Sequence, residues 1–306
     1  MNFSRAQRFG IALVAFAGLF ARARAETVVL SPAADTMLSE YFPSNNFGAM
    51  TFMNCGTSER NYRNRALLRF DLSAIPSGAR IDAVALKLEI VRNSVNGYAI
   101  AQFSLHRLLV PWGEGDKTNA PGGTSGQGSP ATVGDATWTN RFAFTTNLWA
   151  APGGGATNDY VPAASAANFI YNTSDYTFAS TALTVADVQL WRDQPATNFG
   201  WFIVCDNESE LYTARRIGTR EDPANTPRLT VNYTPFLISN PAVVSNQCTF
   251  SFTALAGRAT AVQFNNLLAA TGWQTLTNFS APPADTNHVI TDFLAAPQRF
   301  YRLASP

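Results

Sequence analysis

The clearest pattern of hydrophobic and polar positions lies in the segment 83–91. From Val84 to Ile90 every second residue is a valine, leucine or isoleucine, and the residues between them are small or charged. This alternation predicts a β-strand with one face on a core and the other in water. A second strand-like run lies at 66–71, and Pro76-Ser77-Gly78 supplies a turn between the two runs. The pair therefore predicts an antiparallel sheet.

Short strands separated by turn residues recur over the first two thirds of the chain. Such spacing predicts an all-β fold, an antiparallel β-sandwich of jelly-roll type. One short helix is expected, capped by Thr184 with Asp187 three residues later, and with Val188 and Trp191 on one face. The expected strands are Thr27–Ser31, Thr51–Cys55, Ala66–Asp71, Ala83–Val91, Ala101–Leu109, Asp135–Thr139, Leu183–Thr184, Gly200–Asp206, Tyr212–Ile217 and Arg228–Tyr233.

The N-terminal segment 1–25 reads as a secretory signal peptide. Arginines precede an apolar stretch at 9–21, and Ala23-Arg24-Ala25 ends in an A-x-A cleavage pattern. An N-terminal membrane anchor is the alternative, but the apolar stretch is shorter than the roughly 20 residues that span a bilayer. No later segment is apolar enough to span. The mature protein is therefore predicted to be secreted, without a membrane span.

Two domains are predicted after the signal peptide. Residues 26–234 carry the jelly-roll pattern. Near Pro235 the pattern changes to shorter alternations, such as Phe250 with Phe252 and Val262 with Phe264. These alternations predict a small immunoglobulin- or fibronectin-like β-sandwich over 235–306.

Composition narrows the choice of function and redox state. Charged residues make up 14% of the chain and the net charge is +1, which gives no general attraction to nucleic acid. The hydrophobic fraction of 46% indicates packed cores rather than disorder.

The cysteines are Cys55, Cys205 and Cys248, and an odd number leaves at least one thiol unpaired. Export would permit a bridge between Cys55 and Cys205, and free buried thiols are the alternative.

Several short motifs follow one another through residues 32–234. They are Ala34-Asp35-Thr36, Asn45-Asn46-Phe47-Gly48, the Arg65–Phe70 strand with its turn, Pro111-Trp112-Gly113-Glu114-Gly115, Ala136-Thr137-Trp138, the Asp187–Trp191 helix, and Pro227 to Tyr233. In this order they resemble the DNRLRE domain family, which overlaps carbohydrate-binding module family 96. The resemblance implies a β-jelly-roll module of secreted enzymes or surface proteins that binds polysaccharide, including uronate-rich chains. The segment from 235 onward resembles a C-terminal module common on exported bacterial surface proteins.

Arginines gather in two segments of the first predicted domain. Guanidinium groups match carboxylates and sulfates in bidentate geometry, so an acidic polysaccharide would fit if the segments share one sheet face. Arg65 and Arg69 lie opposite the apolar parity of Leu68 and Phe70, so they are expected to reach solvent. The alternative is ordinary solvated arginine, partly paired with nearby acids. The predicted ligand-binding residues are Arg60, Tyr62, Arg63, Arg65, Tyr212, Arg215 and Arg216, with Trp112, Trp138, Trp149 and Tyr160 as further aromatic candidates of which Trp138 is expected in the core.

Metal and catalytic signals are weaker. Side-chain oxygens of Asp35, Asn45, Asp206 and Asn207 could hold a structural calcium ion, although no EF-hand spacing occurs. No catalytic residue and no other cofactor is predicted. The two histidines, His106 and His288, fall in different predicted domains, and no phosphate-binding loop is present. Carboxylates for sugar cleavage would have to come from pairs such as Glu114 with Asp116 or Glu208 with Glu210.

These patterns predict a secreted, non-catalytic carbohydrate-binding protein that recognises an acidic polysaccharide through arginines and exposed aromatics. The first alternative is a structural or adhesive surface protein without a sugar site. Such a protein would have scattered or paired arginines and no exposed aromatic beside them. The second alternative is an orphan polysaccharide lyase or hydrolase, which would show a deep cleft with an acid/base pair. The sequence leaves the glycan and the oligomeric state open.

Overall fold

A computed structural model describes residues 25–304 apart from positions 95, 123–125, 270 and 297. All but the last residue of the predicted signal peptide lie outside this range. The described chain forms two compact units, an N-terminal unit that ends at Phe236 and a C-terminal unit that begins at Leu237. None of the helices in the described ranges is long and apolar enough to cross a membrane.

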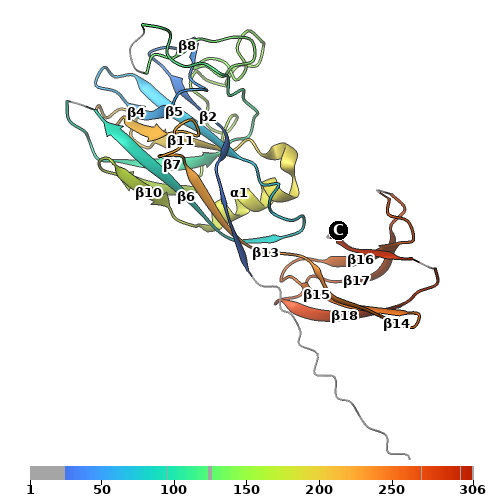
Figure 1. The fold of residues 1–306 in the computed structure, drawn as a ribbon. Coiled ribbons are helices and arrows are strands. Elements are labelled where there is room, and N and C mark those ends of the chain that lie inside the picture. Colours follow the sequence, from blue (N-terminus) through green and yellow to red (C-terminus); the bar gives the residue numbers. More distant parts are fainter. Residues whose placement is uncertain (1–24, 95, 123–125, 270, 297, 305–306) are drawn as a thin grey trace, which may run out of the picture. The chain divides into compact units, whose positions relative to one another are not determined.

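The N-terminal unit is built from antiparallel strands (Figure 1). The strands follow the order β1-β13-β6-β12-β4-β5-β11-β7-β9, with β10 paired to β6 and β2 paired to β5, and a small separate pair β3-β8. The bounds are β1 Glu26–Leu30, β2 Pro32–Ser39, β3 Asn45–Asn46, β4 Phe52–Thr57, β5 Arg63–Phe70, β6 Arg80–Asn93, β7 Ala101–Arg107, β8 Ser129–Pro130, β9 Ala166–Ile170, β10 Ser174–Phe178, β11 Trp201–Cys205, β12 Arg215–Gly218 and β13 Arg228–Thr234.

Strand β4 connects two layers of this sheet system. Its residues Phe52–Cys55 pair with β12, whereas Gly56 and Thr57 pair with β5. Gly56 has a φ of +101°, a conformation that a side chain would strain, and an added Cβ would lie 2.7 Å from the carbonyl oxygen of Thr213. The sheet therefore curls over at β4, and the predicted antiparallel β-sandwich is confirmed.

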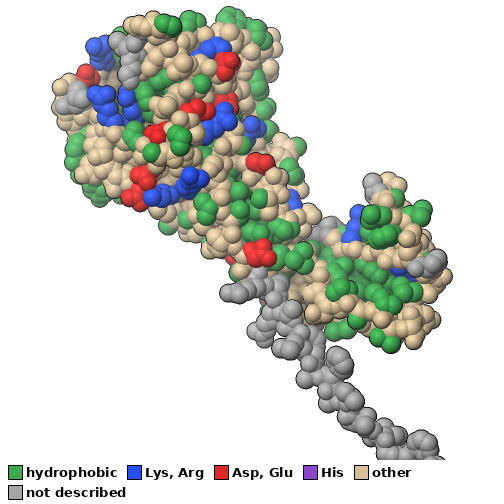
Figure 2. All heavy atoms as spheres, in the orientation of Figure 1, with side chains coloured by type: hydrophobic (Ala, Val, Ile, Leu, Met, Phe, Trp, Pro, Cys, Tyr) green, Lys and Arg blue, Asp and Glu red, His purple; other side chains and the backbone are tan. Residues whose placement is uncertain are grey.

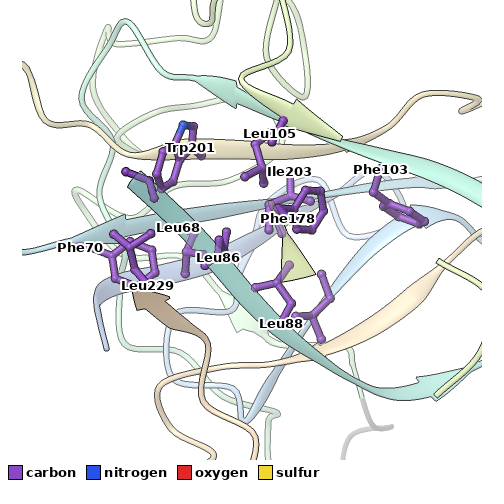
Figure 3. Packing of buried hydrophobic residues seen from close by; sticks show 14 of the residues in the cluster. Leu68, Phe70, Leu86, Leu88, Phe103, Leu105, Phe178, Trp201, Ile203 and Leu229 are labelled. Carbon is purple, nitrogen blue, oxygen red and sulfur yellow. The ribbon is translucent and has the colours of Figure 1, made fainter. Parts of the chain in front are cut away.

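The main core lies between the two layers. Val84, Leu86, Leu88 and Ile90 of β6 are all buried, as their alternation predicts. Figure 3 shows the side chains of β6 packed with those of β5, β7 and β11, and with Phe178 of β10 and Leu229 of β13. Burying a leucine or phenylalanine of this kind contributes about 1.5–3 kcal/mol, so this core is the principal source of stability.

A second hydrophobic cluster covers the outer face of β5 and β11. Leu67 and Phe202 from these strands pack with Trp112, Trp138 and Trp149 from the long irregular segment between β7 and β9. The expected strand Asp135–Thr139 is wrong, because this stretch forms turns closed by a bond from the Thr137 amide to the Asn140 carbonyl. Its apolar residues are buried by packing on the sheet rather than by strand pairing.

The N-cap of the helix α1 (Ala182–Asp193) lies three residues before the predicted cap, Thr184. Thr181 is the N-cap, and its hydroxyl accepts from the Thr184 amide at 3.0 Å, with the reciprocal bond from the Thr181 amide to the Thr184 hydroxyl. The expected strand Leu183–Thr184 is therefore wrong, because both residues lie in the first turn. Val188 and Trp191 are buried as predicted. A short 3-10 turn, Pro195–Thr197, follows.

The C-terminal unit consists of two three-stranded antiparallel sheets. Their orders are β14-β15-β18 and β17-β16-β19. Phe250 and Phe252 of β15 and Val262 of β16 are buried between the strands. The bounds are β14 Ile238–Val244, β15 Gln247–Ala254, β16 Thr260–Asn265, β17 Gln274–Phe279, β18 Thr286–Phe293 and β19 Phe300–Ala304.

Candidate functional site

Three polar side chains form one row across adjacent strands of the N-terminal unit. Arg216 on β12 lies opposite Asn54 on β4 and, on its other side, opposite Arg92 on β6. Neighbouring strands are about 4.8 Å apart, so the side chains of such a row lie next to one another. The strand pairing thus places two guanidinium groups and an amide side by side.

The row lies on the outer face of the sheet. Along β12 the neighbours of Arg216, Arg215 and Ile217, are fully buried, whereas Arg216 is half-buried and Arg92 is exposed. The guanidinium carbon of Arg216 is 3.5 Å from the centre of the Phe52 ring, which holds its side chain flat on the sheet. In Figure 2, blue Lys and Arg side chains gather at the end of this unit where β6 terminates in Figure 1.

A groove of about 290 Å³ contains this row, which we call the arginine groove. Burial and the neighbouring charge of Arg92 lower the pKa of Arg216 to about 10. A negative group in the groove would relieve this repulsion between two like charges. The lining residues are Asn54, Ser58, Glu59, Asn64, Arg92, Asn93, Ser94, Ala214, Arg215 and Arg216.

Exposed aromatic rings lie on the connections beside the arginine groove. The β4–β5 connection carries Tyr62, whose ring centre is 4.7 Å from that of Tyr41. The two tyrosines are 36% and 44% exposed, and Arg60 donates to the Tyr41 hydroxyl at 3.3 Å. Tyr98, on the β6–β7 connection, is 46% exposed. Flat exposed rings next to hydrogen-bonding groups are the surface that sugar rings can stack on.

Arg63 and Arg65 bind carboxylates of the protein itself. Arg63 makes a two-pronged pair with Glu40, at 2.7 Å and 3.0 Å, which lowers the pKa of Glu40. Arg65 makes a similar pair with Glu208, at 2.6 Å and 2.7 Å, and donates to the carbonyls of Gly153 and Gly154. Both guanidinium groups are therefore already engaged by the protein.

The expectation that Arg65 reaches solvent is wrong, since it is 8% exposed. Arg65 does lie on the face opposite Leu68 and Phe70, as its position in the strand predicts. That outer face is covered by the segment carrying Trp138, whose ring centre is 6.0 Å from the Arg65 guanidinium. Arg69, on the same parity but at the end of β5, is exposed as predicted.

Arg215 is also buried rather than available to a ligand. Its two terminal nitrogens donate to six backbone carbonyls, those of Tyr212, Thr213, Ala214, Ala99, Ile170 and Tyr171. Tyr212 has a positive φ of 63° and is half-buried. The arginine joins three chain segments and has a structural role. Of the seven predicted ligand residues, Arg60 and Tyr62 are exposed and Arg216 lines the arginine groove.

The predicted calcium ligands are distributed over different surroundings. Asp35 is buried on β2, Asn45 donates to the Gln127 carbonyl at 2.9 Å, and the Asn207 side chain accepts from the Ser209 hydroxyl at 2.7 Å. Asp206 is exposed. Within the described ranges no set of three or more His, Cys, Asp and Glu side chains is arranged to hold a metal. Asp35 instead is hydrogen-bonded to Glu114 and Arg220.

The remaining chemical candidates are engaged in the fold. Cys55, Cys205 and Cys248 are free, buried thiols, so the Cys55–Cys205 bridge is absent. Three of the four carboxylates considered for catalysis are bound to cations: Glu114 to Arg220, Asp116 to Lys117, and Glu208 to Arg65. The imidazole of His106 lies 3.0 Å from the Val161 carbonyl, and burial lowers the pKa of this histidine.

Sequence reasoning missed Arg92 and Asn54. Alternation along β6 assigns Arg92 to the core face with Ile90. In the structure the pairing with β12 shifts register between Arg216 and Ile217, so Arg92 faces Arg216 while Ile90 faces Ile217. One extra residue on β6 reverses the parity at its end, which is how a bulge redirects a side chain. The sequence signal for this change is Arg92 itself, because it places a charge at the next core-facing position of the alternation that ends at Ile90.

Two comparisons with known proteins bear on this surface. No curated protein matches the chain. Residues 26–140 match the model of carbohydrate-binding module family 96. The matched part contains Asn54, Tyr62 and Arg92 and ends before Arg216, and it is shorter than the stretch over which the motifs of the sequence resemble that family. This part of the chain is similar to a carbohydrate-binding module.

Proposed function

We propose that this chain is a secreted protein whose N-terminal unit binds an acidic, uronate-rich polysaccharide at the arginine groove. The observation that carries the proposal is the cross-strand pairing of Arg92 with Arg216 beside Asn54. Like charges directly opposite each other destabilise a sheet, and an anionic ligand bound in the groove would relieve this repulsion. The similarity of residues 26–140 to a carbohydrate-binding module supports a sugar polymer as that ligand.

In the proposed complex each part of the site has a separate role. Arg92 and Arg216 donate to carboxylates of successive sugar units, in the bidentate geometry that guanidinium groups favour. The amide of Asn54 bonds a hydroxyl. Tyr62, with Tyr41, stacks on the apolar face of a sugar ring next to the groove. The single carboxylate in the lining, Glu59, accepts from Asn96 at 2.5 Å and lies at the exposed edge.

Affinity electrophoresis and calorimetry on a polymer panel test this function. Alginate and polygalacturonate are compared with a neutral β-glucan, at low and high salt. Arg92→Gln and Arg216→Gln are each expected to weaken binding to the acidic polymer about tenfold or more, since a hydrogen bond to a charged group contributes about 1.5–3 kcal/mol. The salt dependence should become shallower, because fewer charges are screened.

Arg228→Gln is the matched control, because Arg228 is exposed on β13 of the same unit and outside the groove. It removes the same charge and should leave affinity unchanged. An equal loss in all three variants would show only a general charge effect and would remove the groove from the proposal.

The second candidate function is a structural or adhesive surface protein. The pairing of Arg63, Arg65 and Arg220 with Glu40, Glu208 and Glu114 favours it, since those arginines serve the fold. If the wild-type protein is retained by none of the polymers, this second function is preferred.

A further inference from the structure

A group of acidic side chains lies away from the arginine groove, around Arg220. Asp35 of β2 accepts from the Arg220 amide at 2.9 Å, and its own amide donates to Glu114 at 2.8 Å. The Arg220 guanidinium is 2.9 Å from Glu114 and 2.9 Å from Glu221. We call Asp35, Glu114, Arg220 and Glu221 the carboxylate cluster. It joins three segments that are far apart in the sequence.

Two carboxylate oxygens of this cluster are buried without a hydrogen-bond partner. They are Oδ1 of Asp35, a residue that is 1% exposed, and Oε2 of Glu221. Removing a charged oxygen from water without replacing its hydrogen bonds is costly. Both atoms belong to residues that contact Arg220, so a positive partner in this cluster could satisfy them.

The charge of the carboxylate cluster supports the same conclusion. Three carboxyl groups face the Arg220 guanidinium, and the charge of Arg69 also acts on Glu114, so acidic groups outnumber basic ones here. The local field therefore favours positive charge. A proton shared by the two oxygens would neutralise one negative charge, whereas a divalent cation bound to both carboxylates would neutralise two.

We propose that the carboxylate cluster binds a calcium ion, with Asp35 Oδ1 and Glu221 Oε2 as its protein carboxylate ligands. Calcium takes six to eight oxygen ligands and accepts backbone carbonyls and water beside carboxylates. Two carboxylates are therefore sufficient, and no set of three is required. Glu114 is a positioning residue, because it holds the Asp35 amide and the Arg220 guanidinium at the edge of the site.

The expected consequence is stabilisation of the N-terminal unit. The ion would connect β2 to the segment after β12, which lies some 185 residues away in the sequence. The proposal does not depend on the polysaccharide, because the cluster shares no residue with the arginine groove.

Thermal unfolding of the full mature chain at pH 7.5 tests the site. After dialysis against EDTA, addition of calcium chloride to about a hundredfold excess over Kd should raise Tm by about 5–10 °C. Titration calorimetry should show one calcium bound per chain. Asp35→Asn and Glu221→Gln should each remove both the shift and the binding heat. Asp206→Asn, at an exposed acid outside the cluster, should behave as the wild type.

Two results would overturn the proposal. If calcium gives neither a Tm shift nor binding heat in the wild type, while Asp35→Asn is at least as stable as the wild type, Asp35 is satisfied by a proton instead. If calcium binding persists in both Asp35→Asn and Glu221→Gln, the ion binds elsewhere. Should Asp35→Asn fail to fold, Glu221→Gln alone decides by its binding heat.

Discussion

Single residues of the same type serve opposite purposes in this protein, and their surroundings decide which. Arg65 is buried and bound by Glu208 and by two glycine carbonyls, whereas Arg216 lies against Phe52 and lines the arginine groove. In the sequence, these two arginines were equal candidates for binding a ligand. The difference is what covers the sheet face on which each lies, and for Arg65 the cover includes Trp138.

The buried ion pair of Arg65 should be strongly stabilising when intact. Arg65→Ala leaves Glu208 and two carbonyls without their partner, so we expect a loss of about 3–5 kcal/mol in the free energy of unfolding. Arg65→Lys keeps the positive charge but not the planar guanidinium that bonds both carboxylate oxygens, so it should lower the free energy of unfolding by less than Arg65→Ala does. Urea unfolding measures both.

Arg69→Ala is the control for this substitution, since Arg69 lies on the same strand and is exposed. It should change the free energy of unfolding by no more than about 0.5 kcal/mol. A similarly small change for Arg65→Ala would mean that the buried pair contributes nothing, contrary to the expectation.

At the level of elements, the sequence predicts most of the long strands, including the fully buried β11, and misses β2, β9 and β10. The alternation of β6 was visible, and the strand was found within three residues of its ends. Strand β2 was missed because Met37 enters the main core while Ala34 and Leu38 enter the second cluster. Because both faces of β2 are buried, its sequence lacks the alternation of hydrophobic and polar residues that predicts a strand.

The candidate site was only partly predictable for a related reason. Arg216 was predicted, but its partners Asn54 and Arg92 depend on the order β4-β12-β6 and on a register shift. Strand order and register are set by packing between segments more than a hundred residues apart. A local pattern contains neither.

The start of α1 gives a prediction at the scale of elements. Thr181 accepts from the Thr184 amide and donates to the Ser165 carbonyl, so it anchors the helix to the segment before β9. Thr181→Ala should cost about 1–2 kcal/mol of stability, as loss of an N-cap does. Leu183→Ala, at an exposed position of the first turn, should stay within about 0.5 kcal/mol. Equal stabilities of the two variants in chemical denaturation would argue against the cap.

On the scale of the whole chain, each compact unit buries a core of its own. The N-terminal unit buries residues such as Leu88, and the C-terminal unit buries Phe252, which packs with Phe279 at 5.4 Å between ring centres. A unit with a separate core can unfold as a separate cooperative transition. The C-terminal unit is the smaller, so it should be the less stable of the two.

Calorimetry of core variants can therefore separate the two units. Phe252→Ala should cost about 3–5 kcal/mol, comparable to the whole stability of so small a unit, and should abolish its transition. The larger transition and polymer binding should be unchanged, because the arginine groove belongs to the N-terminal unit. Leu88→Ala should do the reverse, lowering the larger transition by about 2–5 kcal/mol and leaving the smaller one in place. A single transition that both substitutions lower together would mean that the units fold as one cooperative body, and polymer binding lost in Phe252→Ala would mean that the C-terminal unit contributes to the site.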